Sequence, residues 1–129
     1  ISGPLLDRID IIINVPRVET NKLITNEKEE SSGTVHRRVT VARKIQERRF
    51  IMHDVTSNAQ MGPRQIAAYC PLTHSQRKFL KHAIDEYSLS ARSYYRVLKL
   101  ARTIADLSLS DVIRDEHLME ALRFKVQLN

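Results

Sequence analysis

The feature that most constrains this fold is a single β-rich run at the head of an otherwise helix-patterned chain. Ile9–Val15 is rich in isoleucine and valine, residues that favour strands. Pro16 closes the run, because proline cannot donate to a central ladder. One strand alone is not a stable sheet in water. We therefore expect the run either to belong to a larger sheet or to pair with a segment that is absent here, and we expect the chain to be a fragment.

The rest of the sequence predicts helices. A polar stretch over residues 19–33 carries few structure-forming signals and is typical of a linker. Beyond it, apolar residues at helical spacing, Pro63 at a first helical position, and capping residues at Thr73 and Ser90 mark successive helix starts. The predicted helices cover 34–50, 63–69, 74–87, 91–107 and 115–124.

The longest of these helices has two distinct faces. One side of 91–107 is apolar and wide enough for a core, whereas the opposite side carries Arg92, Arg96 and Lys99. Either those cations form an ordinary solvated face, or Arg92 reaches a phosphate at the helix start. The expected core residues are Val97, Leu98, Ala101, Ile104, Leu118, Ala121 and Leu122.

Charge points to an anionic partner. The chain has 21 Lys and Arg against 15 Asp and Glu, a net charge of +6, and much of the excess lies between residues 36 and 49. Within that predicted helix Arg37, Lys44 and Arg48 lie roughly opposite the apolar stripe. They could contact DNA or a neighbouring subunit, or simply face solvent.

Several classes of protein receive no support. No apolar run is long enough to span a bilayer, and the one cysteine, Cys70, cannot form an internal disulfide, so a cytoplasmic protein is expected. The five histidines lack ligand spacing, so no metal site is predicted. No GxxxxGK[ST] loop is present, so nothing in the chain could cradle a triphosphate.

Four blocks carry a resemblance to a known family. They are SGPLLDRIDI, NAQMGPRQIAAYCPL, LSARSYYRVLKLARTIADL and IRDEHLMEALRF, in this order along the chain. Together they resemble the C-terminal part of the magnesium-chelatase-like AAA+ ATPases, closest to the competence protein ComM type. The resemblance implies a mainly α fold: a small helical bundle, the AAA+ lid, with one N-terminal β-strand left from the ATPase core sheet. Its parts would be the end of the α/β core (1–18), a linker (19–33) and the C-terminal helical lid (34–129).

The resemblance also implies roles for particular arginines. In this family an arginine before the last core strand projects into a neighbouring subunit's nucleotide site, and LLDRID places it at Arg8. The flanking Asp7 and Asp10 could orient Arg8, or Asp7 could simply cap local structure. An arginine at the start of a lid helix senses the γ-phosphate, which places the second sensor at Arg92, with Arg96 a weaker candidate.

The implied protein is an ATPase ring, whose parent would use ATP and Mg²⁺ while this chain alone binds neither. The implied partners are its own N-terminal AAA+ core, the neighbouring protomers of a hexamer, and DNA, with no membrane; the chain itself is expected to be monomeric. Two alternatives stay open. One is an autonomous basic helical module that binds DNA, and the other is a magnesium-chelatase subunit acting on tetrapyrroles.

Overall fold

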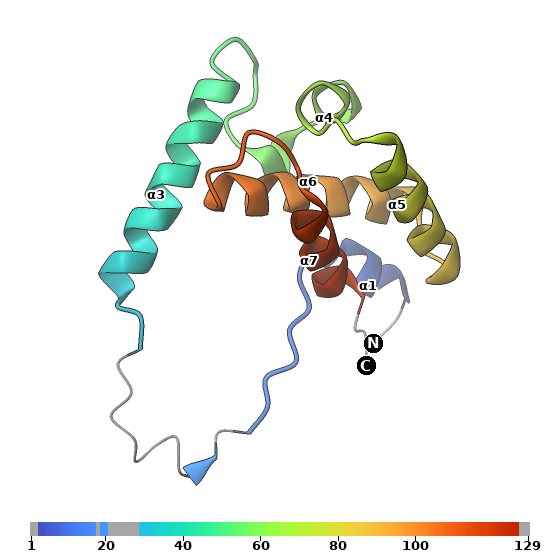
Figure 1. Cartoon of the computed structure of the whole chain (residues 1–129), viewed down its shortest axis with the longest axis horizontal. Coiled ribbons are helices and arrows are strands. Elements are labelled where there is room, and N and C mark those ends of the chain that lie inside the picture. Colours follow the sequence, from blue (N-terminus) through green and yellow to red (C-terminus); the bar gives the residue numbers. More distant parts are fainter. Residues whose placement is uncertain (1–2, 18, 21–28, 127–129) are drawn as a thin grey trace.

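A computed structural model describes residues 3–17, 19–20 and 29–126, and Figure 1 shows a helical bundle crossed by one central helix. The regular elements that the described residues form are the α-helices α1 (Gly3–Arg8), α3 (Ser32–Arg49), α4 (Pro63–Tyr69), α5 (His74–Glu86), α6 (Ala91–Leu107) and α7 (Asp115–Lys125), and the short 3₁₀ helix η1 (Asn58–Gln60).

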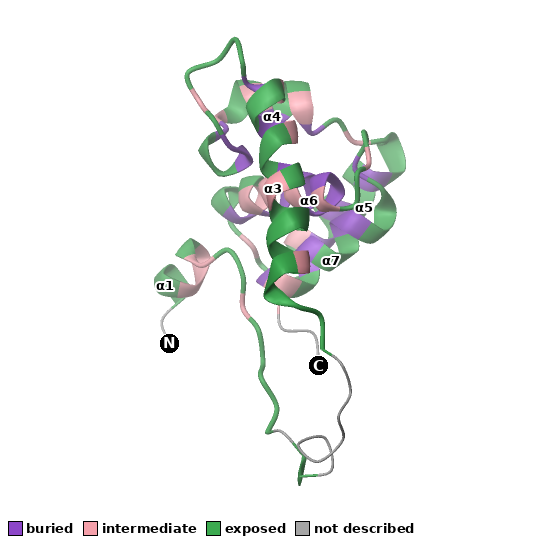
Figure 2. Cartoon of the chain, turned by 90° about the vertical axis from the view of Figure 1, so that its left-hand side faces the viewer, coloured by how far each residue is buried: buried purple, intermediate pink, exposed green. Residues whose placement is uncertain are grey.

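The central helix is α6, against which α7, α3, η1, α4 and α1 all pack. Eight of its seventeen residues are buried, so this helix organises the core. Figure 2 shows the buried residues gathered around α6 while the outer surfaces of α3 and α5 stay exposed. All the core residues expected from the sequence are buried: Val97, Leu98, Ala101, Ile104, Leu118, Ala121 and Leu122.

Local capping explains where the helices begin. The hydroxyl of Ser90 accepts a hydrogen bond from the backbone N–H of Ser93 at 3.2 Å, and α6 begins at the next residue, Ala91. At α5, Thr73 and Gln76 form a reciprocal capping box. The predicted starts of both helices are therefore confirmed.

The predicted N-terminal strand is wrong for this chain. Residues 9–17 adopt no regular secondary structure, and no strand occurs among residues 3–17, 19–20 and 29–126. One backbone bond, from the N–H of Ile12 to the carbonyl of Phe124 at 2.7 Å, ties the segment to the end of α7. Ile11, Ile13 and Val15 remain exposed. A strand needs a neighbour that pairs its alternate N–H and C=O groups, and no described segment supplies one.

A buried polar network joins α3 to α6. The Asp106 carboxylate accepts two hydrogen bonds from Arg49, at 2.6 and 2.8 Å, and further bonds from Asn58 and Arg102. Asp106 is only 1% exposed. A buried carboxylate is tolerated when cations and donors satisfy it. Arg49, which the sequence places in the basic segment, is thus a structural residue that fixes the C-terminal end of α3.

Candidate functional site

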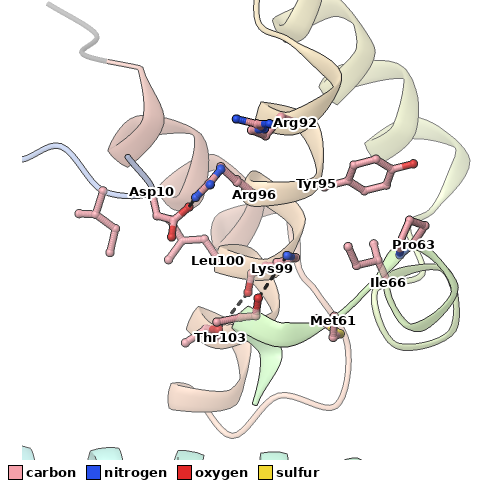
Figure 3. Close-up of a pocket in the computed structure, with 12 residues that line it drawn as sticks. Asp10, Met61, Pro63, Ile66, Arg92, Tyr95, Arg96, Lys99, Leu100 and Thr103 are labelled. Atoms are coloured by element: carbon pink, nitrogen blue, oxygen red, sulfur yellow. Dashed lines mark hydrogen bonds and ion pairs between the residues drawn. The ribbon is translucent and has the colours of Figure 1, made fainter. Parts of the chain in front are cut away.

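The candidate site is a groove of about 570 Å³ along α6 from Arg92 to Thr103. Figure 3 shows Arg92, Arg96 and Lys99 following one another down this side of the helix. Met61, Pro63 and Ile66 supply an apolar wall, and Asp10 and Ile11 come from the segment after α1. The groove therefore combines a row of cations with an apolar surface.

Arg92 is the exposed cation of this row. It is the second residue of α6, and no described residue forms a hydrogen bond or ion pair with its side chain. A cation in the first turn is mildly unfavourable beside the positive end of the helix dipole, but the Asp7 carboxylate at the same helix start attracts it. The guanidinium, which has no hydrogen-bond partner among the described residues, presents donors suited to an anion.

Arg96, one turn further on, is already engaged. Its guanidinium forms an ion pair with Asp10, seen at the side of the groove in Figure 3. Its Nε is buried without a hydrogen-bond partner. Arg96 is therefore less available to an incoming anion than Arg92 is.

Lys99 completes the row. Its Nζ donates to the carbonyl of Ala59 at 3.2 Å, which ties α6 to η1. The neighbouring Tyr95 also lines the groove and is partly exposed. In chemical terms the groove can hold an anionic group at Arg92, with Tyr95 and the apolar wall available to a flat ring.

The end of α1 docks directly on the start of α6. The Asp7 carboxylate accepts hydrogen bonds from the hydroxyls of Ser90 and Ser93, each at 2.6 Å. These two bonds hold the pKa of Asp7 below its ordinary value of 3.8, and the positive charges of Lys125 and Arg92 lower that pKa further. Asp7 thus joins the N-cap of the helix that carries Arg92.

Lys125 secures the same junction from α7. Its Nζ donates to the carbonyls of Leu6, Asp7 and Ile9 at 2.9–3.0 Å, at the C-terminal end of α1, where a cation is favourable. Burial lowers the pKa of Lys125. Sequence reasoning missed Lys125 and the partners of Asp7, because these contacts join residues at opposite ends of the chain.

Arg8 is the last residue of α1 and is exposed, with no side-chain hydrogen bond or ion pair to a described residue. Neither neighbouring aspartate contacts it, since Asp7 binds the start of α6 and Asp10 pairs with Arg96. Neither of the two roles considered for Asp7 describes these contacts, because its carboxylate joins α1 to α6 instead of orienting Arg8 or capping local structure. Arg8 lies one residue from the junction, with its guanidinium facing solvent.

The basic residues of α3 lie apart from the groove. Arg37, Lys44 and Arg48 are exposed, and they lie on the side opposite the buried Ala42 and Gln46. Arg37 donates to the hydroxyl of Thr34 at 3.2 Å, whereas the side chains of Lys44 and Arg48 contact no described partner. The structure therefore does not bring these cations together with Arg92.

The structure gives no support to a reactive cysteine, a metal site or a membrane-spanning helix among the residues that it describes. Cys70 is buried, and desolvation raises the pKa of its thiol to about 11, which disfavours the reactive thiolate. Among the residues that the structure describes, no three His, Cys, Asp or Glu side chains are grouped to hold a metal ion. No described helix has the length and apolar character needed to cross a membrane.

Comparison with known proteins covers nearly the whole chain. Residues 29–125 match the family described as "Magnesium chelatase, subunit ChlI C-terminal". The chain is 39% identical over 126 residues to protein YifB of Salmonella typhimurium and 36% identical over 129 residues to competence protein ComM of Haemophilus influenzae. The alignments include 97% and 99% of this chain but 24% and 25% of the two relatives. The chain thus spans about a quarter of the length of these relatives.

Proposed function

Because the chain belongs to the magnesium-chelatase C-terminal family, with relatives that include a competence protein ComM, we propose that it is the lid of an AAA+ ATPase. In this proposal the chain closes over ATP held by a separate core. Arg92 senses the γ-phosphate, and the movement of α6 passes hydrolysis on to the rest of the assembly.

The observation that carries the proposal is the state of Arg92. Its guanidinium is exposed at the start of α6 in a groove, without a partner among the described residues. Arginine suits this work because it is always protonated and can bond two phosphate oxygens at once. Arg96 would serve only if its ion pair with Asp10 opened, so Arg92 is the primary sensor.

In this proposal the chain supplies a contact for one phosphate and not the site for a whole nucleotide. Arg92 and the groove fit a γ-phosphate, whereas the binding loop for a triphosphate is absent from the sequence. Mg²⁺ would neutralise charge on the phosphates in the complete enzyme. Asp10, the carboxylate in the groove, is already paired with Arg96. The core would therefore supply the loop and the metal ligands, and this chain would supply the sensor.

Arg8 is proposed to complete the nucleotide site of a neighbouring protomer. It is exposed at the end of α1, so its guanidinium is free to reach another chain. Asp7 connects this helix end to the start of α6. A shift of α6 on loss of the γ-phosphate would therefore move the end of α1 and with it Arg8. Hydrolysis at one site of the ring would in this way change the nucleotide site of the neighbouring protomer.

A ring of this kind, a hexamer in our proposal, would act on DNA. The Haemophilus influenzae relative is named a competence protein, and the net charge of +6 suits an anionic substrate. A chelatase subunit acting on tetrapyrroles is the alternative that the family description favours. Stimulation of ATP hydrolysis by DNA but not by a porphyrin would decide between them.

The test is ATP hydrolysis by the full-length protein of which we propose this chain to be the C-terminal part. Replacing Arg92→Ala is expected to lower kcat by about 10-fold or more, which corresponds to about 1.4 kcal/mol of barrier. Assembly and folding of the variant are checked by sedimentation and circular dichroism.

Arg64→Ala is the matched control, because Arg64 is also an exposed arginine at the second position of a helix, α4. It should leave turnover unchanged. Equal turnover in the Arg92→Ala variant and the wild type would contradict the sensor role.

A further inference from the structure

The loop after α3 presents two apolar side chains to solvent. Ile51 and Met52 keep 79% and 89% of their surface exposed. In Figure 1 the loop projects at the upper end of α3, beyond the rest of the bundle. These two side chains gain nothing from burial in this chain, and a contact with another molecule would remove their apolar surface from water.

This turn, residues 51–52, is held firmly at its base. Phe50 is 2% exposed, and the neighbouring Arg49 is bound to the buried Asp106. On the far side, the backbone N–H of His53 donates to the carbonyl of Phe50 at 2.8 Å, and the His53 ring contacts the hydroxyl of Tyr69 at 2.7 Å. Because the residues on both sides of the turn are fixed, Ile51 and Met52, the tip of the turn, can contact a partner without a rearrangement of the turn.

The helix that leads to this tip carries a cationic stripe, defined by Arg37, Lys44 and Arg48. All three are exposed, and no acid among the described residues pairs with them. They span about 16 Å along the helix, a length over which one DNA strand presents about five phosphates. Glu47 and Asp54 are the nearest acids in sequence, and neither forms an ion pair with the stripe.

We propose that α3 tracks the DNA backbone with this stripe and inserts the Ile51–Met52 tip beside a base at a junction between paired and unpaired strands. Apolar wedges of Ile and Met next to cations are a known means of unstacking a base step. The charge of the stripe favours DNA over a protein partner, because its three exposed cations complement a row of phosphates, although the exposed acids Glu47 and Asp54 lie beside the tip. The inference rests on the proposed action on DNA, and it requires neither Arg92 nor hydrolysis.

The first test measures binding of the nucleotide-free chain to labelled duplex DNA by fluorescence anisotropy. We expect weak binding that falls steeply between about 50 and 200 mM NaCl. Reversing the stripe with Arg37→Glu, Lys44→Glu and Arg48→Glu should abolish measurable binding in the upper part of this range. Replacing the same three residues with Gln should make the slope of log affinity against log salt shallower by about 3.

The matched control reverses three exposed cations of α5, Arg77→Glu, Lys78→Glu and Lys81→Glu. Figure 1 places α5 on the other side of α6 from α3. This variant has the same net charge as the reversed stripe. If it loses DNA binding equally, or if the wild-type chain does not bind at low salt, the proposed surface is overturned.

The second test addresses the tip with a forked duplex that carries 2-aminopurine at its first base pair. Wild-type chain should raise the fluorescence of this base as it unstacks. Ile51→Ser with Met52→Ser should remove that rise while leaving binding to a fully paired duplex within about 2-fold. Phe79→Ser with Met119→Ser, two partly exposed apolar residues elsewhere, should leave the rise intact.

Two outcomes would overturn the role of the tip. One is an unchanged 2-aminopurine signal in the Ile51→Ser, Met52→Ser variant. The other is self-association of the wild-type chain that this variant abolishes, which would assign the tip to a subunit contact. Neither outcome bears on Arg92, whose failure would instead appear as unchanged ATP turnover in the Arg92→Ala variant.

Discussion

At the scale of single residues, the arginines of this chain divide by their partners. Arg49 and Arg102 are committed to Asp106 within the protein. Arg96 is held by Asp10, whereas Arg8 and Arg92 have exposed side chains with no described partner. The same residue type therefore supports the fold at some positions, and at others it remains available to a ligand. Burial and pairing separate the two groups.

Asp106 gives the clearest prediction at this scale. Asp106→Ala would leave Arg49 and Arg102 without their carboxylate in a buried site, and such breakage of a buried pair costs about 3–5 kcal/mol. We expect the free energy of unfolding, measured with urea, to fall by that amount. Asp85→Ala, at an exposed position on α5, should change it by less than about 0.5 kcal/mol. Similar values for both variants would show that the network does not hold α3 in place.

At the scale of elements, the contact of α1 with α6 favours the ionised form of Asp7. Hydrogen bonds from Ser90 and Ser93 lower the pKa of Asp7 in the folded protein. The stability that they contribute is therefore present above 3.8, the ordinary pKa, and is lost as the pH falls through the lower folded value.

The expected result is a smaller loss of stability in acid for Asp7→Asn than for the wild type. The free energy of unfolding in urea, determined at a series of pH values below 3.8, measures this loss of stability for each variant. Asp85→Asn serves as the comparison, because its side chain is exposed and contacts no described partner. An acid response of Asp7→Asn that matches the wild type would mean that the docking of α1 adds no stability.

The helices could be predicted from the sequence because their signals are local. Ser90, Thr73 and Pro63 lie within a turn of the helices that they start, and the apolar stripe of α6 identifies its own core face. The strand could not be predicted in the same way. Residues 9–15 have strand composition, but a strand depends on pairing with a neighbour.

The candidate site was less accessible to sequence reasoning than the fold. Arg92 could be singled out by its place at a helix start, although its role stays a prediction. The network of Arg49 with Asp106 joins residues 57 positions apart, and Lys125 reaches Asp7 across 118 positions. Nothing in a single sequence indicates which distant charges meet, so these partners emerge only in three dimensions.

At the scale of the whole molecule, the two exposed arginines Arg8 and Arg92 lie on helices that hydrogen bonds join to one another. Asp7 and Lys125 fasten the end of α1 to α6 and α7. The cationic stripe and its tip lie on α3, which Asp106 fastens to the other end of α6. In the proposed ring, movement of α6 would therefore reach both a neighbouring nucleotide site and the DNA surface.

The measurement that tests the central claim most directly is the ratio of affinities for a non-hydrolysable ATP analogue and for ADP in the full-length protein. The two ligands differ chiefly at the γ-phosphate, and a hydrogen bond to a charged group contributes about 1.5–3 kcal/mol. We predict that Arg92→Ala lowers this ratio by about 10-fold or more, while Arg64→Ala leaves it unchanged. An unaltered ratio in the Arg92→Ala variant would contradict the claim that Arg92 senses the γ-phosphate.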